Sequence, residues 1–258
     1  LQVFLHSLNT VVTSLFAIDS RLLKLKICQF LARLLTIIIV APIFIKSIAS
    51  ELAERTGIIS CMHLKDRIRG YLPVVIDVET AGFNESKDAL LEICAIILDI
   101  DESGSFIQTE PIHFHIKPFR GANLEPSALK FNGIDVNNPF RMAVTEKQAL
   151  NEIFTKVKAE LSNKECTRAI LIGHNAFFDL GFLKAATERV KIKSPFHQFS
   201  TLDTVTLSAL YYGETVLAKA MVKAGIEWDD SQAHSALYDT QKTAELFCKI
   251  FNEQEFRL

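Results

Sequence analysis

The chain has 258 residues, of which 49% are hydrophobic and 22% are charged, a balance typical of a globular protein and not of a disordered one. Its formal net charge is −2, and residues 62–258 alone carry 22 basic and 27 acidic side chains. A protein that binds nucleic acid over its whole surface usually has a basic balance, so these numbers argue against that class. They allow an enzyme that combines an acidic metal site with a local basic patch.

The five cysteines are far apart in the sequence and odd in number, and none belongs to a C-x-x-C pair. This spacing argues against a zinc site or a disulfide framework. We therefore expect buried, reduced thiols in a cytoplasmic protein. The cysteines are Cys28, Cys61, Cys94, Cys166 and Cys248.

Residues 1–61 differ from the rest because they are rich in apolar side chains and sparse in charge. Their longest apolar run, residues 34–45, lies between Arg33 and Lys46 and is shorter than the roughly 20 residues that a membrane helix needs. The first methionine is Met62. We interpret residues 1–61 as upstream translated sequence ahead of a domain at residues 62–258, with a signal or anchor segment and a packed extra element as alternatives. A membrane association is not favoured.

The first predicted strand covers residues 74–76 and runs into the Asp-Val-Glu of residues 77–79, because Val-Val-Ile is typical of a buried strand. A second strand is predicted at residues 90–100, followed by a turn at residues 101–104. Residues 111–117 alternate strictly between apolar side chains and the histidines His113 and His115, which predicts a third strand.

Helical spacing begins after Thr145, a predicted N-cap, and continues to residue 161. A further strand is predicted at residues 169–172, and helices follow at about residues 177–190, 203–211, 215–224 and 233–251. Strands grouped early and then mixed with helices indicate an α/β domain with a mixed central sheet flanked by helices.

Asp77 and Glu79 lie two residues apart at the end of the first strand, so both carboxylates point to the same face. Neighbouring carboxylates in an apolar region repel each other unless a cation lies between them. Oxygen ligands favour magnesium or manganese over zinc. The pair therefore indicates a site for a hard divalent cation, although this motif alone is weak evidence.

Three more residues extend this pattern. Asp179 follows the predicted strand at residues 169–172, where a shared metal site would be built. His234 and Asp239 lie on the last predicted helix, five positions apart, so that they flank a site from adjacent sectors. In that arrangement Asp239 reaches the metal and His234 deprotonates a water molecule.

With these acidic residues and His234 in this order along the chain, the sequence resembles the histidine subgroup of the DEDD superfamily of 3′–5′ exonucleases. Within that subgroup it resembles the bacterial ribonuclease T family. The resemblance implies a ribonuclease H-like fold and covers residues 71–258, with residues 1–61 as an atypical apolar extension. The stretches that carry it are residues 71–83, 113–115, 121–124, 131–135, 174–176, 195–197 and 232–239.

The resemblance also implies the chemistry. Asp77, Glu79, Asp179 and Asp239 would bind two Mg²⁺ ions, with Mn²⁺ as a possible substitute, and His234 would be the general base. The substrates would be the 3′ ends of tRNA and other stable RNAs and of single-stranded DNA, released as nucleoside 5′-monophosphates. A homodimer would pass RNA from a basic patch on one subunit to the active site of the other.

Further residues take roles from the same resemblance. Four phenylalanines would sandwich the last two bases, and three arginines belong to the clusters that would form the basic patch. The phenylalanines are Phe83, Phe131, Phe178 and Phe199, and the arginines are Arg67, Arg69 and Arg168. We interpret His113, His115 and His197 as structural or solvent-facing. Where the family has a glutamate that reads the terminal base, this chain has Ser127, which leaves its terminal-base preference open.

Four other hypotheses remain at this point. Two are related activities, a proofreading-type DNA exonuclease and an oligoribonuclease, against which the phenylalanine set argues. A nucleic-acid-binding protein without catalysis is disfavoured because all five catalytic positions hold the required residue types. A membrane-tethered nuclease would require residues 17–50 to act as an anchor.

Overall fold

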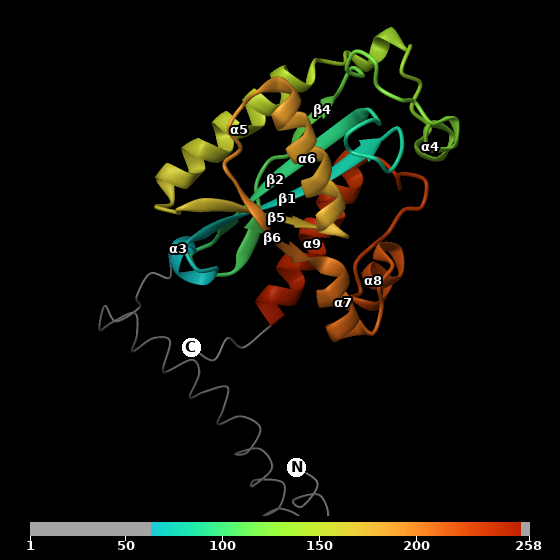
Figure 1. The fold of residues 1–258 in the computed structure, drawn as a ribbon. Helices are drawn as coiled ribbons and strands as arrows, with labels where there is room; N and C mark the ends of the chain where they lie inside the picture. The colour runs from blue at the N-terminus through green and yellow to red at the C-terminus, as the bar shows by residue number, and fades with distance from the viewer. Residues whose placement is uncertain (1–62, 254–258) are drawn as a thin grey trace, which may run out of the picture. The chain divides into compact units, whose positions relative to one another are not determined.

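A six-stranded mixed sheet forms the centre of residues 63–253, the part of the chain that the computed structural model describes (Figure 1). The expectations for residues 1–61 lie outside these residues. The strands are β1 (Tyr71–Thr80), β2 (Leu90–Ile100), β3 (Phe106–Gln108), β4 (Ile112–His115), β5 (Arg168–Gly173) and β6 (Phe196–Asp203).

The strand order is β3-β2-β1-β5-β6, and β4 pairs with β2. β1 is antiparallel to β2 and parallel to β5, and β5 is parallel to β6. β1 is therefore the central strand, which explains why its apolar residues Val74, Val75 and Ile76 are all fully buried. The parallel strands β1, β5 and β6 end at the same edge of the sheet.

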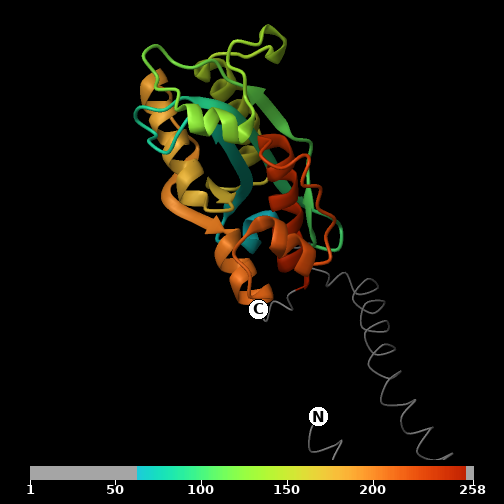
Figure 2. The same cartoon turned by 90° about the vertical axis from the view of Figure 1, so that its right-hand side faces the viewer.

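Helices cover both faces of this sheet, as the two views in Figure 1 and Figure 2 show. On one face lie α5 (Glu146–Asn163) and α6 (Ala176–Val190); on the other lies α9 (Ala236–Glu253), accompanied by α7 (Thr204–Tyr212) and α8 (Leu217–Lys223). The remaining elements are α3 (Leu64–Arg67), α4 (Pro126–Asn132) and the 3₁₀ helix η1 (Pro139–Arg141). No helix of residues 63–253 is both long and apolar enough to cross a membrane.

Local sequence explains where the main helices begin and what they bury. Thr145 accepts a hydrogen bond from the Gln148 amide while the Gln148 side chain accepts one from the Thr145 amide, a capping box that starts α5. At the other end of the chain, Phe247 of α9 is fully buried and packs edge-to-face on Phe106 of β3. The capping box sets where α5 starts, and the ring contact holds α9 against the sheet.

The predicted fold class is confirmed, and so is the helix that begins after Thr145. β6 was not predicted, because its sequence FHQFSTLD has no regular apolar alternation; it is held by its parallel pairing with β5. The last helix begins at Ala236 and not at residue 233, so His234 precedes the helix. This difference changes how His234 is positioned.

Arg189 lies in a basic stretch of the sequence together with Lys184, Lys191 and Lys193, but in the fold its side chain forms internal contacts. Its guanidinium contacts both carboxylate oxygens of Glu146, at 2.8 and 3.2 Å, and donates to the Glu85 carbonyl. Its planar group also lies over the Phe119 ring, 4.2 Å from the centroid. Since Glu146 is only 5% exposed, this pair joins α5 to α6 and leaves Arg189 committed to structure.

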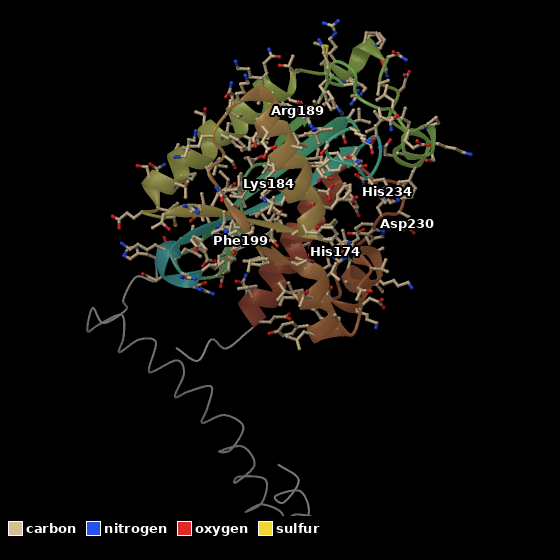
Figure 3. The ribbon with its side chains drawn as sticks, viewed as in Figure 1. His174, Lys184, Arg189, Phe199, Asp230 and His234 are labelled. Carbon is tan, nitrogen blue, oxygen red and sulfur yellow. The ribbon has the colours of Figure 1, made fainter. Side chains whose placement is uncertain are left out.

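Replacing Arg189 with methionine should therefore destabilise the fold, because it leaves the Glu146 carboxylate buried without its partner. We expect the free energy of unfolding in urea to fall by about 3 kcal/mol. Lys184→Met on the exposed side of the same helix is the matched control and should change stability little (Figure 3). An Arg189→Met protein of unchanged stability but weakened RNA binding would instead place Arg189 in the RNA path.

Candidate active site

The carboxyl end of β1 brings three acidic side chains together. Asp77 and Glu79 project from the same face of β1, towards α9, and Asp239 reaches them from the first turn of α9. One oxygen from each of the three carboxylates lies within 4.8 Å of the others. The sequence placed these residues on two separate elements, and the fold joins them.

Asp179 adjoins this set from α6 on the other face of the sheet. β1 stops pairing with β5 after Val75, so the backbone amide of Val78 is free to donate to Asp179 Oδ1, at 3.1 Å. Asp179 is only 4% exposed, and its charge acts on Asp77. The fourth predicted carboxylate is therefore beside the other three, with one oxygen bound to the backbone between Asp77 and Glu79.

The connection from β5 to α6 holds Asp179 in this position. Asn175 takes a left-handed backbone conformation with φ of 72°, and the Asp203 carboxylate accepts from the amides of Asn175 and Ala176 at 3.2 and 3.0 Å. Gly173 is required just before this turn, because a Cβ there would lie 3.0 Å from both Ala176 Cα and Asp179 Oδ2. The start of α6 is thus fixed against β1.

The protonation equilibria report how crowded these carboxylates are. Burial, followed by the charges of Asp179, Asp239 and Glu79, raises the pKa of Asp77 well above its ordinary value. Burial and the charge of Asp239 raise the pKa of Glu79 to about 8, and burial raises that of Asp239 to about 6. Each ionised carboxylate makes the next harder to ionise, and a cation bound among them would offset this repulsion.

The donor set fits a hard divalent cation. Asp239 Oδ2 accepts from the His234 amide at 3.1 Å, whereas the buried Oδ1 has no hydrogen-bond partner among the described residues. An unpartnered carboxylate oxygen in a buried position is unfavourable unless a ligand satisfies it. Because the ligands are carboxylate oxygens only, the set favours cations such as Mg²⁺ or Mn²⁺ over softer metals.

His234 lies at the mouth of the carboxylate set, in the loop that enters α9. Its backbone is left-handed, with φ of 66°, and its amide is held by Asp239. The exposed imidazole lies over the Phe131 ring, with 4.2 Å between the centroids. The expected helical projection of His234 and Asp239 was wrong, because a turn and not a shared helix relates the two side chains.

A cleft of about 760 Å³ opens beside the carboxylates. Glu79 lies in its wall together with Phe83, Phe131 and Phe178. Phe83 and Phe131 are 88% and 68% exposed, which is unusual for rings of this size. Three of the four predicted base-contacting phenylalanines therefore line one cleft.

The fourth phenylalanine, Phe199, lies apart from this cleft on β6. Its ring is 78% exposed and packs edge-to-face on His197, 4.6 Å between centroids. Figure 3 shows it well away from His234. Within this single chain, Phe199 is not among the residues that line the cleft.

The three predicted basic residues also differ in their surroundings. Arg67 donates to the Gly104 carbonyl and lies over the Phe106 ring at 4.8 Å, so it is bound to the fold. Arg69 and Arg168 are exposed and close together, because Arg168 pairs with Tyr71 at the start of β1. The exposed patch is therefore at the opposite end of β1 from the carboxylates.

Two residues with a clear role were missed from the sequence. Asp203 caps α7 through the Val205 amide at 2.9 Å while it holds the start of α6. Asn132 donates to the Thr80 carbonyl at 3.1 Å, and its contact with Glu79 opposes the rise of the pKa of that carboxyl, which burial dominates. Asp203 is the first residue of the helix predicted at residues 203–211, but its role as a cap and its contact with the start of α6 emerged only from the fold.

Comparison with known proteins gives the same picture. The ribonuclease T family model, described as an exonuclease, matches residues 74–247. The ribonuclease T of Vibrio vulnificus strain YJ016 is 59% identical over 196 residues, which cover 75% of this chain and 90% of that protein. The ribonuclease T of Enterobacter sp. strain 638 is 55% identical over 204 residues, covering 79% and 88%.

Solved structures share the fold. E. coli exonuclease I in complex with a dT13 oligonucleotide superposes with a TM-score of 0.55 at 21% identity, covering 71% of this chain. This chain spans only 42% of exonuclease I. A 3′-exonuclease that recognises the histone mRNA stem-loop gives a TM-score of 0.56 at 16% identity, covering 70% of this chain and 81% of that one.

The raised pKa values predict how stability depends on pH. Without metal, the protonated carboxylates stabilise the fold at low pH, and this contribution is lost as the pH rises through the folded-state pKa values of about 6 for Asp239 and 8 for Glu79. Mg²⁺ binds the ionised form, so it should raise the melting temperature more at pH 8 than at about pH 5.

Thermal unfolding with and without Mg²⁺ across this range measures the effect. The double variant Glu79→Gln/Asp239→Asn is the control, and its melting temperature should respond less to both Mg²⁺ and pH, since only Asp77 and Asp179 of the set can still ionise. An equal Mg²⁺ effect at both pH values in the unsubstituted protein would argue against carboxylate ligands with raised pKa values.

Proposed function

Because the chain belongs to the ribonuclease T family and is a 3′–5′ exoribonuclease, we propose that it trims the 3′ ends of tRNA and other stable RNAs and also degrades single-stranded DNA from the 3′ end. The observation that carries the proposal is the union of three carboxylates within 4.8 Å with an open, phenylalanine-lined cleft beside them. The first feature provides for chemistry at phosphorus and the second for bases that are not paired.

Asp77, Glu79, Asp179 and Asp239 would hold two Mg²⁺ ions, with Mn²⁺ as a substitute. When bound, such ions stabilise negative charge on the attacking and leaving oxygens of a phosphodiester. The four carboxylates would formally balance the positive charge of the two dications. Support comes from the unpartnered Asp239 Oδ1 and from the raised pKa values, both of which a bound cation would relieve.

His234 would accept the proton of the attacking water. The water oxygen forms a bond to the terminal phosphorus while the bond from phosphorus to the 3′ oxygen of the preceding nucleotide breaks. That oxygen takes a proton from solvent to become the new 3′-hydroxyl, and a nucleoside 5′-monophosphate leaves. His234 suits this role because its ring is exposed while its amide is anchored on Asp239. The imidazole can therefore turn towards substrate without losing its place beside the carboxylates.

Phe83, Phe131 and Phe178 would stack on the terminal bases. Stacking on aromatic rings holds single strands with little dependence on sequence, since every base has a flat face. Phe83 and Phe178 pack edge-to-face at 6.1 Å, and Phe131 lines the same cleft. Ser127 and Glu125 are among the polar residues that also line this cleft.

We propose a homodimer in which the basic patch of one subunit serves the active site of the other. Asp77 lies six positions after Tyr71 on β1, which is roughly 20 Å along an extended strand, and Tyr71 is beside Arg69 and Arg168. That distance is too long for both to touch one terminal nucleotide of the same chain. Phe199, which lies apart from the cleft, would likewise act in the assembled dimer.

We assign the exonuclease domain to residues 62–258 and its location to the cytoplasm. The described cysteines Cys94, Cys166 and Cys248 are free thiols, which suits a reducing compartment. The identity to ribonuclease T relatives favours this activity over a proofreading DNA exonuclease or an oligoribonuclease.

Digestion of RNA labelled at its 5′ end tests the proposal. With Mg²⁺ the label should shorten one nucleotide at a time from the 3′ end, and EDTA should stop the reaction. His234→Ala should lower the rate constant by about 10²–10⁴-fold with the melting temperature unchanged. His63→Ala, at an exposed histidine ahead of α3, is the histidine control; internal cleavage products, or a His234→Ala enzyme of full activity, would contradict the assignment.

The cleft predicts a separate effect on substrate binding. Phe131→Ala removes a stacking surface worth about 1–3 kcal/mol per base, so KM for single-stranded RNA should rise by roughly 5- to 150-fold. Phe140→Ala, which removes a phenylalanine that is 89% exposed and outside the cleft, should leave KM unchanged. Equal effects of the two substitutions would show that the cleft does not bind the bases.

A further inference from the structure

A second cluster of possible metal ligands lies next to the carboxylates but is not part of them. Glu92 on β2 faces His115 on β4 in the strand register, and His113 lies two residues away on the same face. Glu92 Oε1 is 2.6 Å from His115 Nδ1 and 3.5 Å from His113 Nε2. One ligand atom from each residue lies within 4.8 Å of the other two.

The two imidazoles are not satisfied by these contacts. His113 Nε2 and His115 Nδ1 are buried, and among the described residues neither has a hydrogen-bond partner of acceptable geometry. The nitrogens are close to the Glu92 oxygen but not aligned with it, and the rings meet edge-to-face at 4.8 Å. The three ligand atoms converge at ion-pair distances while both nitrogens lack an aligned hydrogen bond, an arrangement that a shared cation would satisfy.

The geometry points to a site for a transition-metal dication, and we propose that Glu92, His113 and His115 bind Zn²⁺. Ligands about 2.0–2.1 Å from a tetrahedral zinc are roughly 3.3 Å apart. The distance of 3.5 Å between Glu92 and His113 fits this value, and the 2.6 Å to His115 requires a shift of less than about 1 Å. Three protein ligands leave the fourth position for water, which the partly exposed histidines admit.

Ligand chemistry separates this site from the catalytic one. Imidazole nitrogens favour zinc over magnesium, whereas the oxygen-only set of Asp77, Glu79 and Asp239 favours magnesium. Although burial raises it, the contacts of His113, His115 and the Ala236 amide hold the pKa of Glu92 below its ordinary value. Burial lowers the pKa of His115, in spite of the Glu92 charge, so neutral imidazole and ionised carboxylate are both present.

Of the neighbouring charges, that of Arg141 opposes a bound cation and that of Glu79 favours it. Arg141 lies beside Glu92 and donates to the Leu91 carbonyl, so its guanidinium weakens the site. Glu79 pairs with Glu92 across β1 and β2 and adds negative charge on the other side. Glu92 Oε2 also accepts from the amide of Ala236, the first residue of α9, at 3.3 Å. A bound ion would therefore tie β4 to the helix that carries Asp239.

Zinc titration in saturating Mg²⁺, followed by calorimetry, tests the proposal. We expect one Zn²⁺ per chain in the unsubstituted protein and in Asp77→Asn, which disrupts the carboxylate set. His113→Ala/His115→Ala should bind at least about a hundredfold more weakly, because direct ligands matter more than the groups that orient them. His197→Ala removes a histidine outside the cluster and should bind normally.

Anomalous diffraction at the zinc edge locates the ion without any variant, so a failure of the double variant to fold does not leave the question open. Density among Glu92, His113 and His115 supports the site. Zinc found only among Asp77, Glu79 and Asp239, zinc binding retained by the double histidine variant, or no zinc in the unsubstituted protein would each overturn it.

Discussion

Repulsion among buried carboxylates at the end of β1 is the constraint on which the active region depends. Asp77, Glu79 and Asp239 share a space of less than 5 Å, and Asp179 stands directly behind them. Burial raises the pKa values of Asp77, Glu79 and Asp239, and like charge adds to the rise for Asp77 and Glu79. Such a group persists in a folded protein only if rigid elements hold it and either protons or a cation compensate its charge.

The fold supplies the rigidity through backbone contacts. β1 is central and paired on both sides, yet β5 stops early enough to free the Val78 amide for Asp179. Asp203 ties the start of α6 to that of α7, and Gly173 allows α6 to approach β1 closely. The carboxylates come from two faces of the sheet, and Asp179 and Asp239 each accept a hydrogen bond from a backbone amide.

The sequence predicted those features that depend on local pattern. Alternation on β1 placed Asp77 and Glu79 on one face, the Thr145 cap marked α5, and the mixed order of elements indicated the fold class. Features that depend on tertiary contacts were missed. β6 has no apolar alternation and is held by its pairing with β5. The left-handed turn at His234 accompanies the hydrogen bond that its backbone amide donates to the Asp239 carboxylate. From the sequence alone Arg189 is expected to be a surface charge, and only the fold reveals its ion pair with the buried Glu146.

The phenylalanine-lined cleft and the basic patch would bind the substrate, and the carboxylates beside the cleft would carry out the chemistry. The four carboxylates are proposed to bind divalent cations jointly. Diffraction from crystals soaked in Mn²⁺, recorded at a wavelength where manganese scatters anomalously, locates any bound ion. We expect anomalous density bounded by oxygens of Asp77, Glu79, Asp179 and Asp239. Density absent from that position in crystals that bind Mn²⁺ elsewhere would show that these carboxylates do not form a cation site.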